Sequence, residues 1–168
     1  LIVDAGERLA TFFRETASSS AAEGLPGAEL LPNAVATFVR NHDRQHGGFG
    51  SAPKFPTPVV LQFLLRYHHA TGDTSARDIA THTIDRMLDG GLHDHLGGGF
   101  HRYATDAEWH VPHFEKMLYD QAQVALAALE AFQTTGEVRY RDAVRDILGY
   151  VQRDLTDREG GFYSAEDA

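Results

Sequence analysis

A glycine–glycine–phenylalanine turn occurs three times in this sequence, and its spacing constrains the fold more than any other feature. The turns are Gly47-Gly48-Phe49, Gly98-Gly99-Phe100 and Gly160-Gly161-Phe162, so that the phenylalanines lie 51 and then 62 residues apart. Self-similarity at such a period is typical of repeat folds in which each repeat is one supersecondary unit. Pairs of helical patterns lie between the turns, which predicts an all-α fold of repeated helical hairpins. An ordinary bundle of six helices remains the alternative.

Each of the six helical patterns carries apolar residues at steps of three and four, the period of an amphipathic helix. We find no convincing alternation typical of strands, although short strands could form near Phe100–Tyr103 and Trp109–Val111. The predicted helices are one that ends near Ser18, one that starts near Pro32, one over Val59–Tyr67, one between Gly72-Asp73 and Gly90-Gly91, one that opens after Pro112 and stops at Gly136, and one over Tyr140–Leu155.

Composition excludes several classes of partner. The formal net charge of the 168 residues is −9 and no dense Lys/Arg cluster occurs, so neither nucleic acid nor an anionic membrane surface is an expected partner. Cysteine is absent, which excludes disulfides and thiolate sites, and no apolar run is long enough to span a bilayer. We predict no cofactor and a cytoplasmic location. Because the chain begins with Leu1 and stops just after a glycine turn, we expect it to belong to a longer parent.

The interval between the second and third turns is longer by 11 residues, and the excess matches His101–Pro112. An insertion into one turn of a regular repeat usually lies on the binding face. Half of the ten histidines fall within His93–His113, and histidine is the side chain best suited to acid–base work near neutral pH. Trp109 and Tyr103 beside Arg102 would suit a polyol ligand. The alternative is a hydrated polar loop.

If the fifth helix opens after Pro112, three polar residues share one of its faces: His113, Lys116 and Asp120 lie at i, i+3 and i+7. Glu115 and Tyr119 flank this face. Helical spacing alone does not decide whether the face is solvated or lines a cavity.

Three further motifs have structural and functional interpretations. His93-Asp94-His95 could bind a metal, but no pattern completes the three or four ligands that zinc needs, so no metal is predicted. Gly97–Gly99 lacks the setting of a phosphate loop and is interpreted as a turn. Lys54 and Phe55 lie in an extended segment between two prolines, and Ser164–Asp167 occupies the matching place after the third turn, so both segments would line one rim.

Four segments together resemble the YyaL family, whose eukaryotic members are spermatogenesis-associated, thioredoxin-domain-containing proteins. The resemblance implies an (α/α)₆ toroid of the six-hairpin glycosidase-like type, similar to N-acylglucosamine 2-epimerases. It implies that residues 29–168 form the first half of the toroid, and that residues 1–28 are a linker helix after a thioredoxin-like domain of the parent chain. The segments are Gly47–Pro56, Gly98–Tyr103, Trp109–Ala122 and Gly160–Asp167.

The leading hypothesis is epimerase- or isomerase-like acid–base chemistry on a sugar, by His113 and His101 with Glu115 or Asp120 orienting them. A glycoside hydrolase would instead use two carboxylates among Asp94, Glu115, Asp120 and Asp167. A non-catalytic toroid that binds a sugar, peptide or protein is the third possibility. Half a toroid would expose apolar helix faces, so we also expect a homodimer. The predicted substrate-binding residues are Lys54, Phe55, Arg102, Tyr103, Trp109, Tyr119, Glu166 and Asp167.

Overall fold

The computed structural model describes residues 2–18 and 27–168, which divide into two compact units, Leu1–Leu30 and Leu31–Ala168. The first unit contains helix α1 (Ile2–Ser18), which ends at the residue that the sequence predicted. Its large side chains Leu9, Phe12 and Phe13 are exposed.

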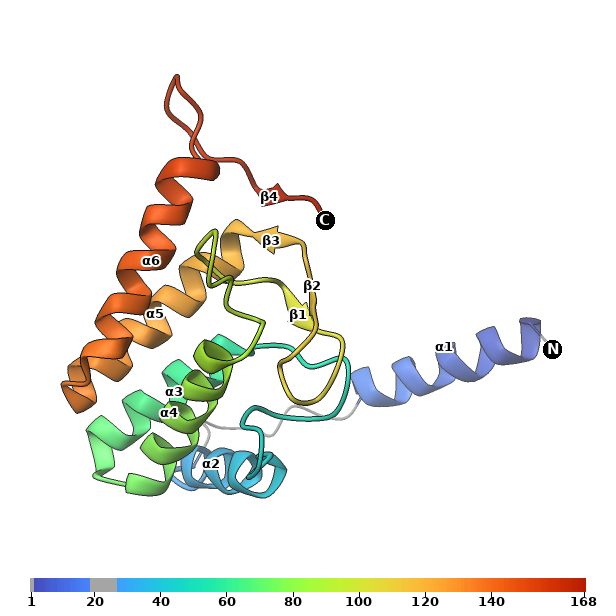
Figure 1. Cartoon of the computed structure of the whole chain (residues 1–168). Helices are drawn as coiled ribbons and strands as arrows, with labels where there is room; N and C mark the ends of the chain where they lie inside the picture. The colour runs from blue at the N-terminus through green and yellow to red at the C-terminus, as the bar shows by residue number, and fades with distance from the viewer. Residues whose placement is uncertain (1, 19–26) are drawn as a thin grey trace. The chain divides into compact units, whose positions relative to one another are not determined.

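The second unit contains one helix followed by two helical hairpins, and each hairpin lies between successive glycine turns as the repeat predicted (Figure 1). In it α3 packs against α4 and α5 packs against α6, and the two hairpins meet where α3 packs against α5. Buried side chains such as Leu61, Ile84, Val124 and Ile147 fill one continuous core across these helices. The fold of this unit is therefore all-α, with two helical hairpins packed against each other. The helices of this unit are α2 (Leu30–Asn41), α3 (Pro58–Thr71), α4 (Thr74–Asp89), α5 (Leu118–Thr135) and α6 (Val138–Asp154).

Local sequence signals set the ends of the hairpin helices. Pro58 lies at the first position of α3, where its missing N–H costs no helical hydrogen bond. Gly72 and Gly136 end α3 and α5 in the left-handed conformation, which glycine adopts without steric cost. Asp73 caps α4, because its side chain accepts hydrogen bonds from the N–H groups of the first helical turn. None of the helices in residues 2–18 and 27–168 has the length and apolar character needed to cross a membrane.

The segments that follow the three glycine turns pair with one another. Strand β1 (Tyr103–Ala104) pairs with β2 (Pro112–His113), and β3 (Lys116–Met117) pairs with β4 (Ala165–Glu166), both in antiparallel register. Lys54, after the first turn, forms an isolated bridge to Ala104. These pairings bring the segments together along one edge, as their matching positions predicted.

The fifth helix begins later than the sequence predicted. It starts at Leu118 rather than just after Pro112, because residues 112–117 are extended and pair in β2 and β3. The prediction that His113, Lys116 and Asp120 share one helical face is therefore wrong. His113 belongs to β2, Lys116 to β3, and only Asp120 to the helix.

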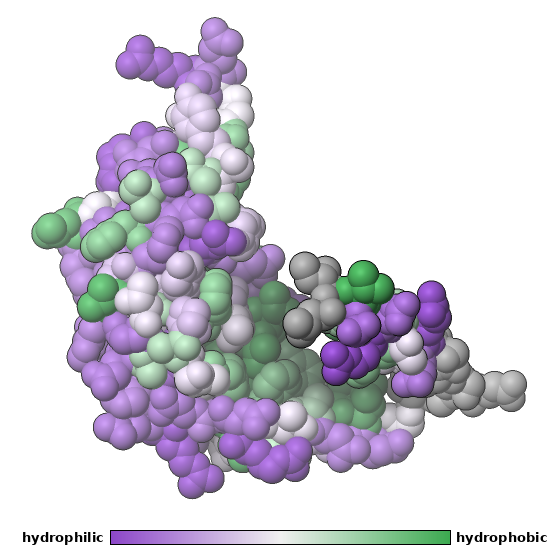
Figure 2. All heavy atoms as spheres, turned by 90° about the vertical axis from the view of Figure 1, so that its right-hand side faces the viewer, coloured by the Kyte–Doolittle hydropathy of each residue, from purple (hydrophilic) through white to green (hydrophobic). Residues whose placement is uncertain are grey.

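Some apolar surface of the second unit is not covered by the packing of its helices. Val59 on α3 and Leu126 and Leu129 on α5 are exposed, at 66%, 44% and 37% of their surface. Figure 2 shows that hydrophobic residues are open on one face of the molecule, with hydrophilic residues around them.

Candidate functional site

The first glycine turn is closed by a buried lysine. Lys54 Nζ donates hydrogen bonds to Asp43 Oδ2 at 2.7 Å, to the Gly47 carbonyl at 2.8 Å and to the Ala107 carbonyl at 2.7 Å. Burial alone would raise the pKa of Asp43, but the hydrogen bonds from Lys54 and from two backbone N–H groups of the turn lower it to about 2. The Lys54–Asp43 pair therefore fixes the turn in its folded shape.

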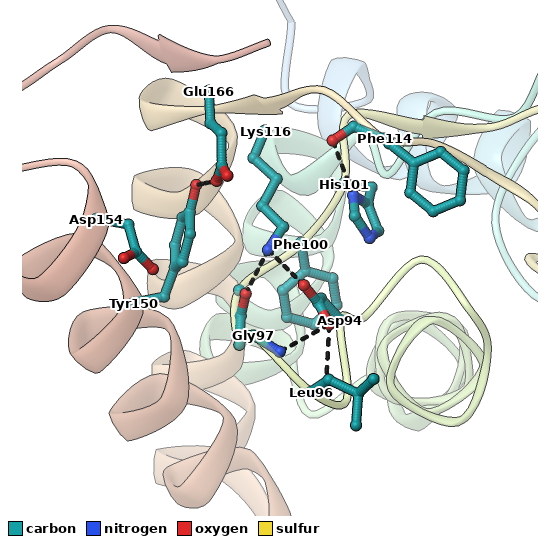
Figure 3. Close-up of polar contacts among 12 residues, drawn as sticks. Asp94, Leu96, Gly97, Phe100, His101, Phe114, Lys116, Tyr150, Asp154 and Glu166 are labelled. Atoms are coloured by element: carbon teal, nitrogen blue, oxygen red, sulfur yellow. Dashed lines mark hydrogen bonds and ion pairs between the residues drawn. The ribbon is translucent and has the colours of Figure 1, made fainter. Parts of the chain in front are cut away.

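The second glycine turn contains the same arrangement (Figure 3). Lys116 Nζ donates to Asp94 Oδ2 at 2.7 Å and to the Gly98 carbonyl at 2.9 Å, and it lies 4.3 Å from the centre of the Tyr150 ring. Burial would raise the pKa of Asp94, but backbone N–H groups and Lys116 hold it far below its usual range. We call the two arrangements, Asp43–Lys54 and Asp94–Lys116, the turn ties.

The hydrogen bonds of the first turn tie give Lys54 a structural role. Its side chain is completely buried, and an ammonium group has three N–H donors, all of which are engaged. No donor is left for a ligand, so the prediction that Lys54 binds substrate is not supported by its position. Lys116 is buried in the same manner and does not face a cavity as a free cation.

The insertion folds back over the first turn through Trp109. This side chain is completely buried, and its Nε1 donates a hydrogen bond to the His46 carbonyl at 2.7 Å. The ring packs so closely on Gly48 that a Cβ there would lie 2.6 Å from Trp109 Cζ2. Both faces are thus unavailable to a sugar, and Trp109 holds the insertion in place instead of stacking on substrate.

A polar cluster forms where β1, β2 and the start of α5 meet. Arg102 Nη1 donates to Glu115 Oε2 at 2.8 Å, and the His113 Nδ1 atom lies 3.9 Å from the same oxygen. Glu115 and, next to it, Tyr119 raise the pKa of the Arg102 guanidinium through hydrogen bonding. The charges of Arg102 and Glu115 also act on Asp120, in the first turn of α5. We call these five residues the Arg102 cluster.

Asp120 is the least ordinary member of the Arg102 cluster. Only 8% of its surface is exposed, and burial raises its pKa to about 6, although the Arg102 charge opposes the shift. Three buried atoms of this cluster, Asp120 Oδ2, Arg102 Nε and His113 Nδ1, have no hydrogen-bond partner within the described part of the chain. Buried polar atoms are usually paired, so this concentration needs an explanation.

An aromatic column adjoins the Arg102 cluster. The Tyr103 ring stacks on the His113 ring with centroids 4.9 Å apart. The Phe55 ring also packs against the Tyr103 ring, with centroids 4.8 Å apart. Phe55 is 45% exposed, so the end of this column is open to solvent. The structure thus brings together Phe55 from the first post-turn segment and the ring pair of the insertion, as a flat apolar wall beside polar groups.

His101 makes contacts that are separate from those of the Arg102 cluster. Its Nδ1 lies 3.2 Å from the Phe114 carbonyl, which only accepts, so Nδ1 carries the proton and Nε2 is free to accept. Burial lowers the pKa of His101, and the charge of Lys116 adds to this effect. Figure 3 shows His101 close to Lys116.

The acidic residues after the third turn have separate positions. Glu166 Oε2 accepts a hydrogen bond from the Tyr150 hydroxyl at 2.6 Å (Figure 3), which adds to burial in raising the pKa of Tyr150. Asp167 is exposed. Neither residue joins the Arg102 cluster, although the Glu166 charge reaches His101.

The histidines of the His93-Asp94-His95 motif are engaged with protein groups. His93 Nε2 lies 3.0 Å from Asp146 Oδ2, and His95 Nε2 lies 2.9 Å from the Gly90 carbonyl. Asp94 belongs to a turn tie. Within residues 2–18 and 27–168 no three His, Cys, Asp or Glu side chains are arranged to hold a metal ion. The absence of a cofactor stays a prediction.

Sequence reasoning missed Asp43 and Gln121, and it missed the structural role of Asp94 in its turn. Asp43 and Asp94 each lie six residues before the turn phenylalanine, a repeat that could have been found by aligning the turns. Gln121 is fully buried and bonds both the N–H and the carbonyl of Phe100 through its side-chain amide. A single glutamine in a helix gives no such signal in sequence.

Solved structures define the class of fold to which these hairpins belong. The chain is similar to cellobiose 2-epimerase from Spirochaeta thermophila DSM 6192, with a TM-score of 0.74 and 19% identity over 83% of this chain and 38% of that one. It is similar to a sugar epimerase from a ruminal bacterium, with a TM-score of 0.71 and 16% identity over 79% of this chain and 37% of the other. At this identity the likeness shows the fold, an (α/α)₆ toroid of which this chain forms a part.

The family follows from the sequence itself. The profile of the N-acylglucosamine 2-epimerase (GlcNAc 2-epimerase) family matches residues 61–168, and the chain belongs to this family. Spermatogenesis-associated protein 20 of Homo sapiens is 53% identical over 154 residues, and that of Mus musculus is 56% identical over the same length. Each match covers 84% of this chain and 20% of the relative, so the chain spans about a fifth of their length. The finer assignment to the YyaL family stays a prediction.

Proposed function

We propose that the full-length protein is a sugar epimerase or isomerase and that this chain contributes the Arg102 cluster to its active site. The observation that carries the proposal is the set of three buried polar atoms, on Arg102, His113 and Asp120, that no described residue satisfies. Natural proteins keep buried polar atoms without partners mainly where function requires them, so this concentration marks the Arg102 cluster as the candidate site. The open aromatic column beside the cluster suits the C–H face of a sugar ring.

Asp120 has the properties of an acid–base group. With a pKa of about 6, the carboxyl group is ionised in most molecules at neutral pH. This pKa is also close enough to pH 7 for the group both to accept and to release a proton. In the proposed reaction its carboxylate takes the proton from the carbon next to the sugar carbonyl, and the electron pair moves to the carbonyl oxygen. The resulting enediolate then accepts a proton on the opposite face, for which His113 is the candidate donor, so no net proton is lost.

The other members of the Arg102 cluster would bind rather than react. Arg102 and Tyr119 offer N–H and O–H donors to the oxygen on which negative charge develops, and such placed donors stabilise the transition state. Glu115 holds the guanidinium of Arg102 through its 2.8 Å hydrogen bond and would orient it. His101, with a free Nε2, is a second candidate base outside the Arg102 cluster.

The full-length protein incubated in D₂O with free mono- and disaccharides tests this proposal. We expect proton NMR to show deuterium entering at the carbon next to the carbonyl, with a new epimer or ketose. Asp120→Asn and His113→Gln should each lower the rate by about 100-fold or more, the usual contribution of a general acid or base. Asp142→Asn, in an exposed pair with Arg141, is the control and should keep the rate. The rate should rise as the pH rises through about 6, because Asp120 becomes ionised.

Other outcomes would identify the alternatives. Release of a reducing sugar without isotope exchange would indicate a glycoside hydrolase. Binding of sugars with no exchange for any of them would indicate the non-catalytic toroid and overturn the epimerase proposal.

Four properties of the protein stay predictions. They are a carbohydrate ligand, a thioredoxin-like domain in the parent chain, a cytoplasmic location, and homodimer formation by the isolated chain. The exposed apolar residues of α3 and α5, such as Val59 and Leu126, support self-association. Light scattering at tens of micromolar tests the dimer, and a monomer would contradict it.

A further inference from the structure

The first two glycine turns bind the hairpin that follows them in the same way. In the first turn the Gly48 N–H donates a hydrogen bond to Thr83 Oγ1 of α4 at 2.9 Å. In the second turn the Gly99 N–H donates to Asp146 Oδ2 of α6 at 2.8 Å. Each acceptor belongs to the second helix of the hairpin that comes next in the chain. Thr83 and Asp146 therefore have the same role in successive repeats.

The same helices also pack closely on the glycine before the donor. A Cβ on Gly47 would lie 3.0 Å from the Cα of Thr83, and a Cβ on Gly98 would lie 3.0 Å from Oδ1 of Asp146. Both glycines are buried. A glycine turn packed against the second helix of the next hairpin is thus a repeated contact of this fold.

The third glycine turn has the same backbone but no helix against it. The Asp157 N–H donates to the Gly161 carbonyl and the Gly160 N–H donates to the Asp157 carbonyl, as the equivalent groups do in the first and second turns. Yet Gly160 and Gly161 are exposed, and a Cβ on either would meet no atom of the described residues within 4 Å. Phe162 is 64% exposed, whereas Phe100, its equivalent in the second turn, is 1% exposed. The side of the third turn that should face a helix is open.

The third turn keeps its shape without a partner. The Asp157 carboxylate accepts a hydrogen bond from the Tyr163 hydroxyl and another from the Glu159 N–H, in place of the lysine of a turn tie. These two bonds lower the pKa of Asp157. A surface that is already formed loses little conformational freedom when a partner binds to it.

We propose that the third turn, residues 157–163, is a docking surface for a further helical hairpin of the parent chain. The second helix of that hairpin supplies a serine, threonine or aspartate side chain that accepts the Gly161 N–H. The acceptors of the first two turns lie 35 and 47 residues beyond their donor glycines, so we expect this one 35–47 residues beyond Gly161. The curated relatives have room for such a hairpin, because the match covers only 20% of their length.

A second copy of this chain is a poorer fit to the third turn. The second helices of its two hairpins, α4 and α6, already bind the first and second turns through Thr83 and Asp146. A second copy therefore offers neither of these helices as a free partner.

Photo-cross-linking of the full-length protein tests which segment covers the turn. p-Benzoylphenylalanine replaces Phe162, and mass spectrometry identifies the cross-linked peptides. We expect cross-links within one molecule to a helical hairpin beyond residue 168. The same probe at Leu96 is the control, because this residue is completely exposed in the second turn, which already binds α6. It should give no cross-link to that hairpin.

Hydrogen exchange of the unsubstituted full-length protein tests the Gly161 N–H itself. The peptide 158–163 should exchange as slowly as the peptide 46–50 of the first turn, to within about tenfold, because hydrogen-bonded amides exchange only when the structure opens locally. Substitution of the acceptor in the cross-linked hairpin by an apolar residue should speed exchange of the third turn by about tenfold or more. Thr83→Val is the matched variant, and it should do the same for the first turn.

Several results would overturn this docking. They are cross-links to a second molecule, cross-links confined to residues 2–168, cross-linking no stronger than at Leu96, fast exchange of the peptide 158–163, and exchange that no acceptor substitution in the hairpin alters. The exchange of the unsubstituted protein decides if the photoreactive variant does not fold. None of these measurements depends on turnover, so they are independent of the proposed chemistry at the Arg102 cluster.

Discussion

The first and second glycine turns are tied in the same way but are used differently. In both, a lysine bonds the turn aspartate and a glycine carbonyl, and in both an aromatic ring lies over the lysine. In the first repeat Lys54 follows Phe49 by five residues, whereas in the second Lys116 follows Phe100 by sixteen. The extra 11 residues loop out between a turn and a lysine that hold their relative positions, so the tie allows an insertion without loss of the repeat.

The two turn regions also differ in how far their buried polar atoms are hydrogen-bonded. In the first turn Lys54 uses all its donors on turn groups, and one buried atom, His46 Nδ1, lacks a partner in the described chain. The inserted region adds the Arg102 cluster, where atoms of Arg102, His113 and Asp120 are buried and lack partners in the described chain. Unsatisfied polar groups lower stability, and natural proteins keep them mainly where function requires them. The comparison therefore separates residues that hold the fold from residues that we propose bind a ligand.

Removing the lysine of either tie should have the largest effect. Lys54→Met and Lys116→Met each leave a partly buried aspartate and a glycine carbonyl without a donor, so we expect a loss of about 3 kcal/mol in the free energy of unfolding. Urea denaturation followed by circular dichroism measures it. Arg77→Met, which breaks an exposed pair with Asp78, should cost less than about 0.5 kcal/mol. A much smaller loss for Lys116→Met than for Lys54→Met would break the equivalence of the two turns.

The glycines packed under the two rings offer a second test. Gly48 and Gly99 both have φ of +75°, and a Cβ would lie 2.6 Å from Trp109 in one case and 2.7 Å from Tyr150 in the other. Gly48→Ala and Gly99→Ala should each lower stability by about 2–3 kcal/mol, from backbone strain and the clash together. Gly50→Ala is the matched control, with φ of +79° and open space, and should cost only about 1 kcal/mol. Equal losses at all three positions would show that ring packing does not matter.

Acid should weaken the ties in a definite pH window. The pKa of Asp43 is depressed to about 2 in the folded protein, so its contribution is complete above the unfolded value near 4 and is lost as the pH falls through 2. We expect this carboxylate to account for about 2 kcal/mol of lost stability across that window. Urea midpoints between pH 5 and pH 2 measure the loss. Asp43→Asn, already weaker at pH 5, should lose correspondingly less on acidification, and an identical pH profile would contradict the assignment.

The sequence predicted the repeated hairpins because glycine turns and apolar periodicity are local signals. It also identified the inserted region, since an 11-residue excess in one repeat is visible without a structure. It misplaced the start of α5, because β2 and β3 are only two residues long, too short for an alternating pattern to appear, and the partner of β3 lies far along the chain at Ala165–Glu166. Burial was equally hidden. Nothing in the sequence around Trp109 or Lys54 shows that both side chains are completely enclosed, whereas the nearby Tyr103 and Phe55 are not.

Asp120 should respond to substitution with the sign opposite to that of Asp43. Its folded pKa of about 6 lies above the unfolded value near 4, so stability is greatest below pH 4 and falls as the pH rises through 6. At pH 7 the ionised, buried carboxylate therefore costs stability, and Asp120→Asn should raise the free energy of unfolding by about 1–2 kcal/mol while removing activity. Near pH 4 the variant and the wild type should be equally stable. Asp43→Asn should be destabilising at the same neutral pH, so the two variants form a matched pair measured by urea denaturation at pH 7 and pH 4. A loss of stability in Asp120→Asn at pH 7 would mean that Asp120 stabilises the fold as Asp43 does. Asp120, on which the proposed chemistry depends, would then be a structural residue like those of the turn ties.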